Sequence, residues 1–298
     1  MSSALIVGGG LAGLAAAGAL AVRGVRVTLL ESRPRLGGRA SSFLDRAAGE
    51  RIDNCQHVSM GCCTNFRHFC ETAGMFDLFR RERTLYFIAP DGTINPLSAS
   101  AWPAPLHLWP GLRGLSYLSR EDKRSISQGL RALVRANAGN NGQTFDHWLA
   151  TQAQPASAVR RFWEVVLVSA LSESLDRIGV EPARKVFVEA FLAHRDGWEV
   201  QVPAVPLDVL YGERLSTWLA GQGVEIRLKT GAERVTLRDG RARGVVLRDG
   251  EHLSADHVIL AVPQHRVLSL LPPDLAARAE FAVVAELESA PISSVHLW

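Results

Sequence analysis

The sequence predicts an α/β fold in which one domain is built from discontinuous segments and a second, mainly helical domain is inserted between them. Three observations predict it. The first 31 residues alternate apolar β-rich runs with one run of small residues, helical patterns continue to about residue 193, and β-rich runs separated by glycine turns return after residue 205. The 298 residues are 47% hydrophobic, so the chain can build a substantial core.

The opening stretch, ALIVGGGLAGLAAAGALAVRGVRVTLLE, carries no charge from Ala4 to Val22, a length that also suits a membrane span. Its internal order favours a folded domain. Ala4–Val7 predicts a strand, the glycines that follow predict a turn and a helix that stops at Gly24, and Val25–Leu30 predicts a second strand. The three residues before Ala4 supply no positive charge, so the stretch lacks the start of a secretory signal.

Three glycines in this unit, Gly8, Gly10 and Gly13, have the G-x-G-x-x-G spacing. The first allows a tight turn, the second lets a pyrophosphate approach the backbone, and the third lets the helix sit close to the sheet. Glu31 ends the second strand, where a carboxylate can accept hydrogen bonds from a ribose. The unit therefore predicts a Rossmann-like nucleotide-binding domain, with Leu11 and Ala12 beside the phosphates.

A second glycine turn indicates which nucleotide binds. After Glu31 comes SRPRLGGRASS. A nicotinamide enzyme has no general need for this turn, whereas the longer FAD benefits from additional backbone and guanidinium contacts to its pyrophosphate. The sequence therefore favours FAD, and the candidate cofactor-binding residues here are Ser32, Arg33, Gly37, Gly38 and Arg39.

The glycine fingerprint, Glu31 and the R-L-G-G-R turn at 35–39 resemble the flavin-containing amine oxidase and carotenoid desaturase superfamily. The segment IDNCQHVSMGCCTNF, residues 52–66, is similar to the one that passes near the flavin there. Its Gln56-His57 pair is most similar to the squalene-associated branch, the hydroxysqualene dehydroxylases. The resemblance implies that Gln56, His57 and the backbone at Val235 contact FAD. Cys55 stands where the resemblance places a glycine, which would permit a close approach or an unusual dihedral angle, so the resemblance does not extend to the loop geometry there.

The resemblance also implies a reaction, the reductive dehydroxylation of hydroxysqualene to squalene in squalene and hopanoid biosynthesis. An allylic hydroxyl would leave as water, and a hydride from reduced FAD would quench the cation. His57 is the candidate catalytic proton donor, because an imidazole can be protonated near neutral pH. The alternative role for His57 is to order the flavin loop.

Two other functional classes stay open. A phytoene-type carotenoid desaturase or an amine oxidase would share the FAD-binding residues but run the flavin in the opposite redox direction. An inactive flavin-fold fragment would bind neither substrate nor the complete cofactor.

The pattern along the chain predicts four segments. A hairpin over 85–97 with an Asp91-Gly92 turn is followed by a stretch rich in proline, glycine and large apolar residues, which predicts a boundary. Large apolar pairs further on, Trp148-Leu149 and Phe162-Trp163, are expected to pack between helices. The predicted segments are an FAD-binding domain in two parts, 1–97 and 205–266, a mainly helical substrate or membrane-facing domain, 98–204, and the start of a substrate-domain sheet, 267–298.

Residues 120–136 predict an amphipathic helix with Ile126, Leu130, Leu133 and Val134 on one face. Together with the apolar residues before it, this helix can form a membrane-facing entrance for a lipid. The alternative, which the pattern favours, is an ordinary packed helix with a solvated basic side.

Composition limits the partners. The 33 basic and 30 acidic residues are interspersed, so the net charge of +3 describes no track for nucleic acid. Cys55, Cys62, Cys63 and Cys70 form no C-x-x-C pair, which favours reduced thiols in a cytoplasmic protein over a metal site. We expect a lipophilic isoprenoid substrate, a separate reductant for the flavin, and peripheral contact with the cytoplasmic membrane as an alternative to a purely soluble state.

The final stretch, APISSVHLW at 290–298, alternates like a strand that begins a new element. In the superfamily it resembles, a further segment completes the substrate sheet and returns to the flavin. We therefore expect a C-terminally truncated or split chain with an open sheet edge at 295–298. Such a chain should bind FAD weakly by itself, and co-expression with the missing segment should restore binding.

Overall fold

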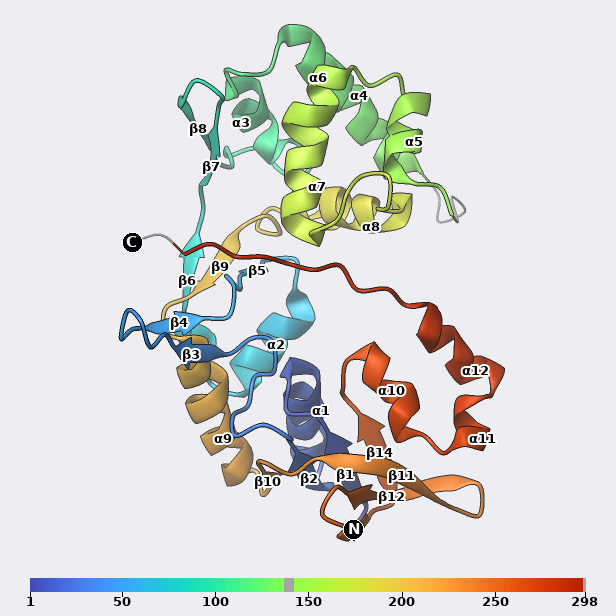
Figure 1. The fold of residues 1–298 in the computed structure, drawn as a ribbon. Helices are drawn as coiled ribbons and strands as arrows, with labels where there is room; N and C mark the ends of the chain where they lie inside the picture. Colours follow the sequence, from blue (N-terminus) through green and yellow to red (C-terminus); the bar gives the residue numbers. More distant parts are fainter. Residues whose placement is uncertain (137–141, 297–298) are drawn as a thin grey trace. The chain divides into compact units, whose positions relative to one another are not determined.

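The computed structural model of the protein describes residues 1–136 and 142–296, and the chain divides into two units (Figure 1). The first, which we call the sheet unit, comprises Met1–His57, His68–Phe79 and Pro203–Trp298. The second, the helical unit, comprises Val58–Arg67 and Arg80–Val202. Helix α2 (Thr64–Thr72) begins in the helical unit and ends in the sheet unit.

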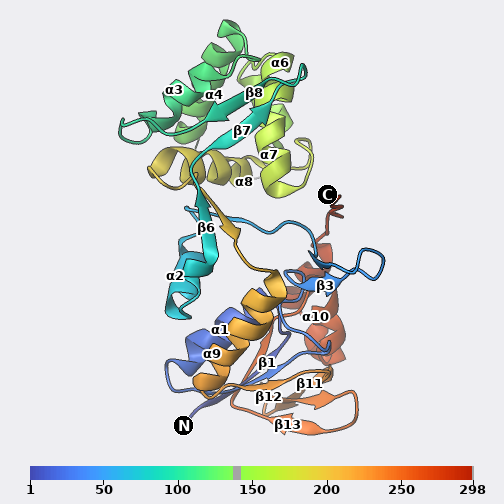
Figure 2. The same cartoon turned by 90° about the vertical axis from the view of Figure 1, so that its left-hand side faces the viewer.

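A four-stranded parallel sheet in the order β10-β2-β1-β14 forms the centre of the sheet unit. Its strands are β1 (Ser3–Val7), β2 (Arg26–Leu30), β10 (Glu225–Arg227) and β14 (His257–Leu260). The apolar sequence of β1 suits a strand that is covered on both faces. On one face, α1 (Leu11–Ala21) and α9 (Leu215–Gly221) lie side by side (Figure 2). Gly18 permits this approach, because a Cβ there would lie 2.8 Å from the Trp218 ring.

A three-stranded antiparallel sheet covers the other face. It consists of β11 (Ala232–Arg238), β12 (Arg241–Leu247) and β13 (His252–Ser254). Asp239 and Gly240, both with positive φ, make the predicted turn between β11 and β12. Leu5 and Val7 of β1 pack against Val235 and Val245 of this sheet in one buried cluster. The predicted return of strands after residue 205 is therefore confirmed.

The remaining elements of the sheet unit are short. They are β3 (Ser42–Leu44), β4 (Arg51–Asp53), η1 (Phe76–Leu78), η5 (Asp208–Arg214), α10 (Gln264–Leu270), α11 (Pro273–Ala276), α12 (Ala279–Ala282) and η6 (Val283–Glu286), where η marks a 3-10 or π-helical segment.

The C-terminal segment corrects two expectations. The start of a sheet was expected over 267–298, but the structure has helices there, followed by irregular chain from residue 287 to 296. The strand expected over 290–298 is absent from residues 290–296, and positions 297 and 298 lie outside the described residues. The physical reason is that alternating apolar residues form a strand only beside a partner strand, and none pairs with 290–296 in the described chain.

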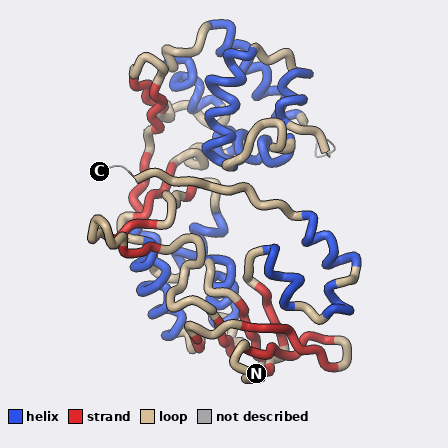
Figure 3. Tube along the Cα trace, viewed as in Figure 1, coloured by secondary structure: helices blue, strands red, loops and turns tan. Residues whose placement is uncertain are grey.

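The helical unit is mostly helix (Figure 3). Its elements are β5 (Ser59–Met60), β6 (Phe79–Glu82), β7 (Leu85–Ile88), β8 (Ile94–Leu97), η2 (Leu106–Leu108), α3 (Trp109–Gly114), α4 (Arg120–Arg135), α5 (Phe145–Thr151), α6 (Ala156–Ala158), η3 (Val159–Trp163), α7 (Glu164–Leu171), α8 (Val180–Arg184), η4 (Lys185–Ala193) and β9 (Val200–Pro203).

Aromatic side chains fill the core of this unit. Trp163 is fully buried, with its ring centroid 5.7 Å from that of Phe145 and 4.8 Å from that of Phe187, both in edge-on geometry. Its indole Nε1 donates to Gln154 Oε1 at 2.9 Å, which satisfies the buried polar group. The prediction that Trp148, Leu149, Phe162 and Trp163 pack between helices is confirmed.

The boundary expected at residue 97 differs from the division in the structure. The β7–β8 hairpin forms as predicted, but it belongs to the helical unit, which takes in Arg80–Val202. The reason is packing, since Leu97 is buried in the aromatic core and Leu85 and Phe87 pack against it. The proline- and glycine-rich stretch also lies within this unit, where Leu108 and Leu112 join the same core.

Candidate functional site

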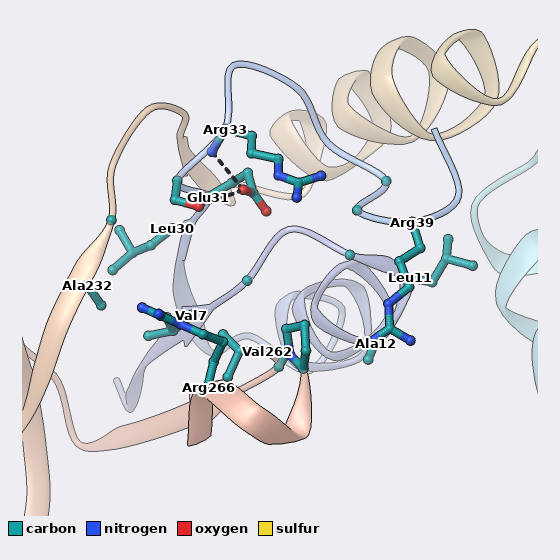
Figure 4. A pocket seen from close by; sticks show the side chains of 18 of the residues that line it. Val7, Leu11, Ala12, Leu30, Glu31, Arg33, Arg39, Ala232, Val262 and Arg266 are labelled. Carbon is teal, nitrogen blue, oxygen red and sulfur yellow. Dashed lines mark hydrogen bonds between the residues drawn. The ribbon is translucent and has the colours of Figure 1, made fainter. Parts of the chain in front are cut away.

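A cavity of about 790 Å³ lies at the carboxyl ends of the parallel strands of the sheet unit (Figure 4). Val7 ends β1, Leu30 ends β2 and Ala261 directly follows β14, and all three line the cavity. In open α/β sheets, ligands bind outside the carboxyl ends of the strands. The volume falls in the range of about 300–1,000 Å³ that is usual for small-molecule and cofactor sites.

The first glycine turn forms one wall. Gly8 has φ +113°, and a Cβ there would lie 2.4 Å from the Ala261 carbonyl oxygen. A Cβ at Gly13 would lie 1.9 Å from the Gly8 carbonyl oxygen, so Gly13 serves packing and does not line the cavity. Gly10 is different, because the nearest atom to a Cβ there is Gly38 Cα at 4.0 Å. The space beside Gly10 is therefore open to a ligand.

Helix α1 begins at Leu11 directly after this glycine, and no side chain caps its first N–H groups. The first turn of a helix leaves backbone N–H groups without intrahelical partners, and these groups attract phosphate oxygens. Leu11 and Ala12, two of the residues predicted to bind the cofactor, both line the cavity. The helix therefore presents its N-terminus where a pyrophosphate is expected.

Glu31 follows β2 and is 7% exposed. One carboxylate oxygen accepts the Gly9 N–H at 2.8 Å. The other accepts the Ser32 hydroxyl at 3.3 Å and the Arg33 N–H at 2.7 Å, and Figure 4 shows Glu31 beside Arg33. These bonds fix the orientation of the carboxylate. A carboxylate offers about four lone-pair positions, and three are used here, so one remains for a ribose hydroxyl.

The second glycine turn lies against the first. The Gly37 N–H donates to the Gly9 carbonyl at 2.9 Å, and Gly10 and Gly37 form an isolated parallel bridge. Gly37 and Gly38 have φ +93° and +61°, which explains why glycine occupies both positions. Arg39 follows directly and lines the cavity.

Positive charge dominates the lining. Arg33, Arg39, Arg248 and Arg266 line the cavity, and the only carboxylate among the described lining residues is Glu31. In the part of the chain that the structure describes, none of these four guanidinium groups forms an ion pair. Guanidinium groups recognise phosphate oxygens through charge-assisted hydrogen bonds. The cavity therefore complements an anionic pyrophosphate.

His57 also lines the cavity. Its ring Nδ1 lies 3.2 Å from the Cys55 carbonyl oxygen, and because a carbonyl only accepts, Nδ1 carries the proton and Nε2 is left for a ligand. Cys55 itself has φ +64°, the left-handed region that favours glycine. Cys55 thus has the backbone conformation that glycine would favour at this position.

Three predicted cofactor residues do not line the cavity, and one of them is Gly13, described above. Gln56 is exposed and does not line the cavity. Val235 is 2% exposed in the core between the two sheets and does not line it either. The sequence therefore brings eleven predicted residues together at the cavity, namely Gly8, Gly10, Leu11, Ala12, Glu31, Ser32, Arg33, Gly37, Gly38, Arg39 and His57.

Several lining residues were not predicted. They are Thr230, Gly231, Ala232, Arg248, Gln264, His265, Arg266 and Leu270. Two runs among them, 230–232 and 264–266, come shortly after the parallel strands β10 and β14. The rule that ligands bind at the carboxyl ends of parallel strands could have found both runs.

The fold and the cavity define a dinucleotide-binding protein of the α/β class. The family model described as flavin-containing amine oxidoreductase matches residues 11–298. The chain belongs to this family, which confirms the expected superfamily and implies a flavin cofactor, typically FAD.

The chain is also similar in sequence to known desaturases and in fold to a solved oxidoreductase. The chain is 26% identical over 315 residues to zeta-carotene desaturase of Zea mays and 27% identical over 312 residues to 15-cis-phytoene desaturase of Narcissus pseudonarcissus. These alignments cover 98% and 99% of this chain but 55% and 53% of the relatives, so the chain spans about half their length. The structure of an oxidoreductase from Methanosarcina mazei superimposes with a TM-score of 0.70 at 18% identity, over 95% of this chain and 64% of that one.

The described residues contain neither a membrane-spanning helix nor a metal-binding cluster. None of their helices is long and apolar enough to cross a bilayer. No group of three or more His, Cys, Asp or Glu side chains within residues 1–136 and 142–296 is arranged to hold a metal ion.

The residues present fit FAD. The open space at Gly10 would let a dinucleotide approach the backbone. The spare acceptor capacity of Glu31 matches the ribose, and the unpaired arginines match the pyrophosphate. All three features belong to the sheet unit, so this unit by itself supplies the lining of the cavity.

Proposed function

We propose that this chain supplies the FAD-binding and helical parts of an FAD-dependent oxidoreductase that acts on a long, apolar isoprenoid. The observation that carries the proposal is the cavity where the open face of Gly10, the Glu31 carboxylate and four arginines meet. The similarity to zeta-carotene and phytoene desaturases supports an isoprenoid substrate.

The roles of the residues follow from their positions. When bound, FAD supplies hydride exchange with a carbon atom of the substrate. Gly10 and the N-terminus of α1 would hold the pyrophosphate, Glu31 would accept hydrogen bonds from the ribose, and Arg39 would neutralise phosphate charge. His57 would hold or move a proton at Nε2.

The particular reaction we propose is the reductive dehydroxylation of hydroxysqualene to squalene. The resemblance of residues 52–66 to the squalene-associated branch supports it. Here His57 would donate a proton to the allylic hydroxyl oxygen, the C–O bond would break, water would leave, and the allylic carbon would take up a hydride to form a C–H bond. The reaction consumes two electrons, so a separate reductant must supply them.

A second candidate is the desaturation of a carotenoid precursor, which the similarity to zeta-carotene and phytoene desaturases favours. Desaturation removes two hydrogens from a carbon–carbon bond and runs the redox reaction in the opposite direction. It needs no proton donor for a leaving hydroxyl. The role of His57 therefore separates the two candidates.

An anaerobic comparison tests the proposal. Oxidised, FAD-loaded protein is mixed with phytoene or zeta-carotene, and reduced protein is mixed with hydroxysqualene. Squalene formation with return of the flavin's visible absorbance supports dehydroxylation, whereas bleaching of the oxidised protein by a carotenoid precursor supports desaturation. His57→Ala should lower squalene formation by much more than it lowers FAD occupancy. If neither arm changes the flavin while FAD is bound at full occupancy, the proposed isoprenoid oxidoreductase is wrong.

We also propose a cytoplasmic location, with peripheral contact at the cytoplasmic membrane as the route to an apolar substrate. The four cysteines are free in the structure, which is typical of a reducing compartment.

A further inference from the structure

We propose that the helical unit contains a second binding site, for a single long hydrocarbon chain that carries an anionic head group. The site is a cavity of about 540 Å³, separate from the FAD cavity and lined only by residues of the helical unit. Apolar side chains form its walls, and Arg131 and Arg135 supply its charge.

The walls suit a hydrocarbon chain. The cavity is lined by Trp109 and Leu112 of α3, Phe162 of η3, Phe187 of η4 and Leu130 of α4. The cavity is within the range of about 300–1,000 Å³ of small-molecule sites, and such sites are mostly apolar with a few placed polar groups.

The edge of the cavity carries large apolar side chains that reach solvent. Trp102 is 50% exposed, Leu106 is 54% exposed and Val134 is 45% exposed, and all three line it. Contiguous exposed apolar surface with charged residues beside it is typical of a ligand-binding groove. A hydrocarbon chain in the cavity would remove this surface from water.

Both charged groups lie on one face of α4. Ser127, Leu130, Arg131, Val134 and Arg135 recur every three or four residues and line the cavity, whereas Ile126 and Leu133 turn to the core. The Ser127 hydroxyl already donates to the Lys123 carbonyl at 2.6 Å. Within the described chain, neither arginine has a carboxylate partner, and no acidic residue lines the cavity.

This charge arrangement selects the head group. Like charges four residues apart on a helix repel each other, and an anion between Arg131 and Arg135 would relieve the repulsion. A carboxylate or phosphate accepts hydrogen bonds from two guanidinium groups, whereas an alcohol or a hydrocarbon offers no charge. The occupant is therefore an anionic amphiphile rather than the uncharged isoprenoid substrate proposed for the flavin site.

The test uses the full chain and a dansyl-labelled fatty acid, whose fluorescence rises when it enters an apolar site. We expect palmitate and hexadecyl phosphate to displace the probe and hexadecanol, with the same chain length but no charge, to compete at least about tenfold less well. Because the cavity lies in the helical unit, saturating FAD should not displace the probe. This result separates the site from the proposed function, which can fail independently.

Three variants and a matched control locate the site. Arg131→Gln and Arg135→Gln should each weaken probe binding about tenfold, because each removes a charge-assisted contact. Arg131→Lys keeps the charge and should retain most of the affinity. Arg124→Gln is the control, because Arg124 is an exposed arginine on the same helix that does not line the cavity. If Arg124→Gln weakens binding as much as Arg131→Gln, the effect is general surface charge and the proposal is wrong.

Two further arms distinguish the source of the ligand. Displacement of the probe by phosphatidylglycerol vesicles but not by phosphatidylcholine vesicles would show that the amphiphile is taken from an anionic bilayer. Displacement by palmitate alone would show uptake from solution, and both results support the site. Loss of probe binding as the protein self-associates would mean that a second copy covers the cavity, and equal competition by hexadecanol would mean that the arginines select nothing. Either result overturns the proposal.

Discussion

Glu31 links the structure of the nucleotide site to its chemistry. Its carboxylate accepts backbone N–H groups from Gly9 in the first glycine turn and from Arg33 at the start of the second. One side chain therefore fixes the loops that surround the place where a ribose is expected.

The first prediction concerns the charge of this residue. Glu31→Gln places an amide NH₂ where one of the two oxygens accepts a backbone N–H, so a buried donor loses its acceptor. We expect a loss of about 1–3 kcal/mol in the free energy of unfolding and about tenfold weaker FAD binding. Urea denaturation and quenching of flavin fluorescence measure the two effects. Unchanged values in both would mean that the carboxylate is not needed there.

The second prediction compares two glycines. Gly10→Ala has room in the protein alone, since the nearest atom to the new Cβ lies at 4.0 Å, whereas Gly13→Ala would place a Cβ 1.9 Å from a carbonyl oxygen. We expect Gly10→Ala to keep the melting temperature but to weaken FAD binding at least about tenfold, because the methyl group occupies the space of the pyrophosphate. Gly13→Ala should lower the melting temperature. Full FAD affinity in Gly10→Ala would contradict this placement of the cofactor.

The third prediction concerns Cys62 and Cys63. The pKa of the Cys63 thiol is lowered to about 6, mainly by a hydrogen bond with Cys62. A backbone hydrogen bond at Met60 and the charge of Lys185 also lower it, although burial opposes the shift. Burial raises the pKa of Cys70 to about 12. Because thiolates are the reactive form, Cys63 should react with iodoacetamide at pH 7 faster than Cys62 or Cys70 does. Its rate of alkylation should fall as the pH drops through about 6.

The control for this prediction removes the hydrogen-bond donor. Cys62→Ala should raise the pKa of Cys63 and slow its alkylation at pH 7, while Cys70 stays unreactive. Mass spectrometry of the labelled peptides separates the sites. Faster labelling of Cys70 than of Cys63 would contradict the assignment.

At the scale of elements, α4 depends on a buried cap. The Ser119 hydroxyl accepts the Asp122 N–H at 3.0 Å, and the Asp122 carboxylate accepts the Ser119 N–H at 3.0 Å. The Ser157 hydroxyl of α6 also donates to Asp122. Asp122 is 2% exposed, so this network joins the start of α4 to α6.

The fourth prediction removes this cap. Burial raises the pKa of Asp122, but hydrogen bonds from Ser157 and Ser119 outweigh it and hold the pKa below its usual value of 3.8. The carboxylate therefore stabilises the folded state above about pH 4, and this contribution is lost as the pH falls below it. Asp122→Ala should reduce the free energy of unfolding by about 2 kcal/mol at pH 7.

Chemical denaturation at two pH values checks the predicted role of Asp122. The difference between wild type and Asp122→Ala should be smaller at pH 3 than at pH 7. An exposed carboxylate on the same helix, Glu121, provides the control, and Glu121→Ala should have a much smaller effect. Equal losses in the free energy of unfolding of Asp122→Ala and Glu121→Ala would contradict the role given to Asp122.

The sequence predicted those elements that local patterns define. The β1-α1-β2 unit follows from apolar runs and glycine spacing, and its predicted strands agree with the structure within one residue at each end. Arg248 and Arg266 escaped prediction, because their convergence on the cavity depends on the strand order β10-β2-β1-β14, which no local pattern specifies. The β7–β8 hairpin was predicted, but the core that receives Leu97 was not, since this depends on long-range packing.

At the scale of the whole molecule, the fifth prediction uses the division into two units. FAD at about 100 times its Kd should stabilise the unit that binds it by about 2.7 kcal/mol. Hydrogen exchange should therefore slow in β1, α1 and β2 but not in α5 and α7 of the helical unit. Gly10→Val, which blocks the cavity, is the control. Equal slowing in both units would show that they unfold together.

The parallel sheet also has a consequence during synthesis. Strand β1 pairs with β2 early, but its other neighbour is β14, and Ser3 bonds to Asp256, 253 residues later. Ribosomes add about 5–20 residues per second, so one edge of β1 waits on the order of 13–50 s for its partner. An open strand edge invites pairing with other chains during this time. The yield of this protein in cells is therefore expected to depend on chaperones that shield nascent chains more than on the stability of the finished fold.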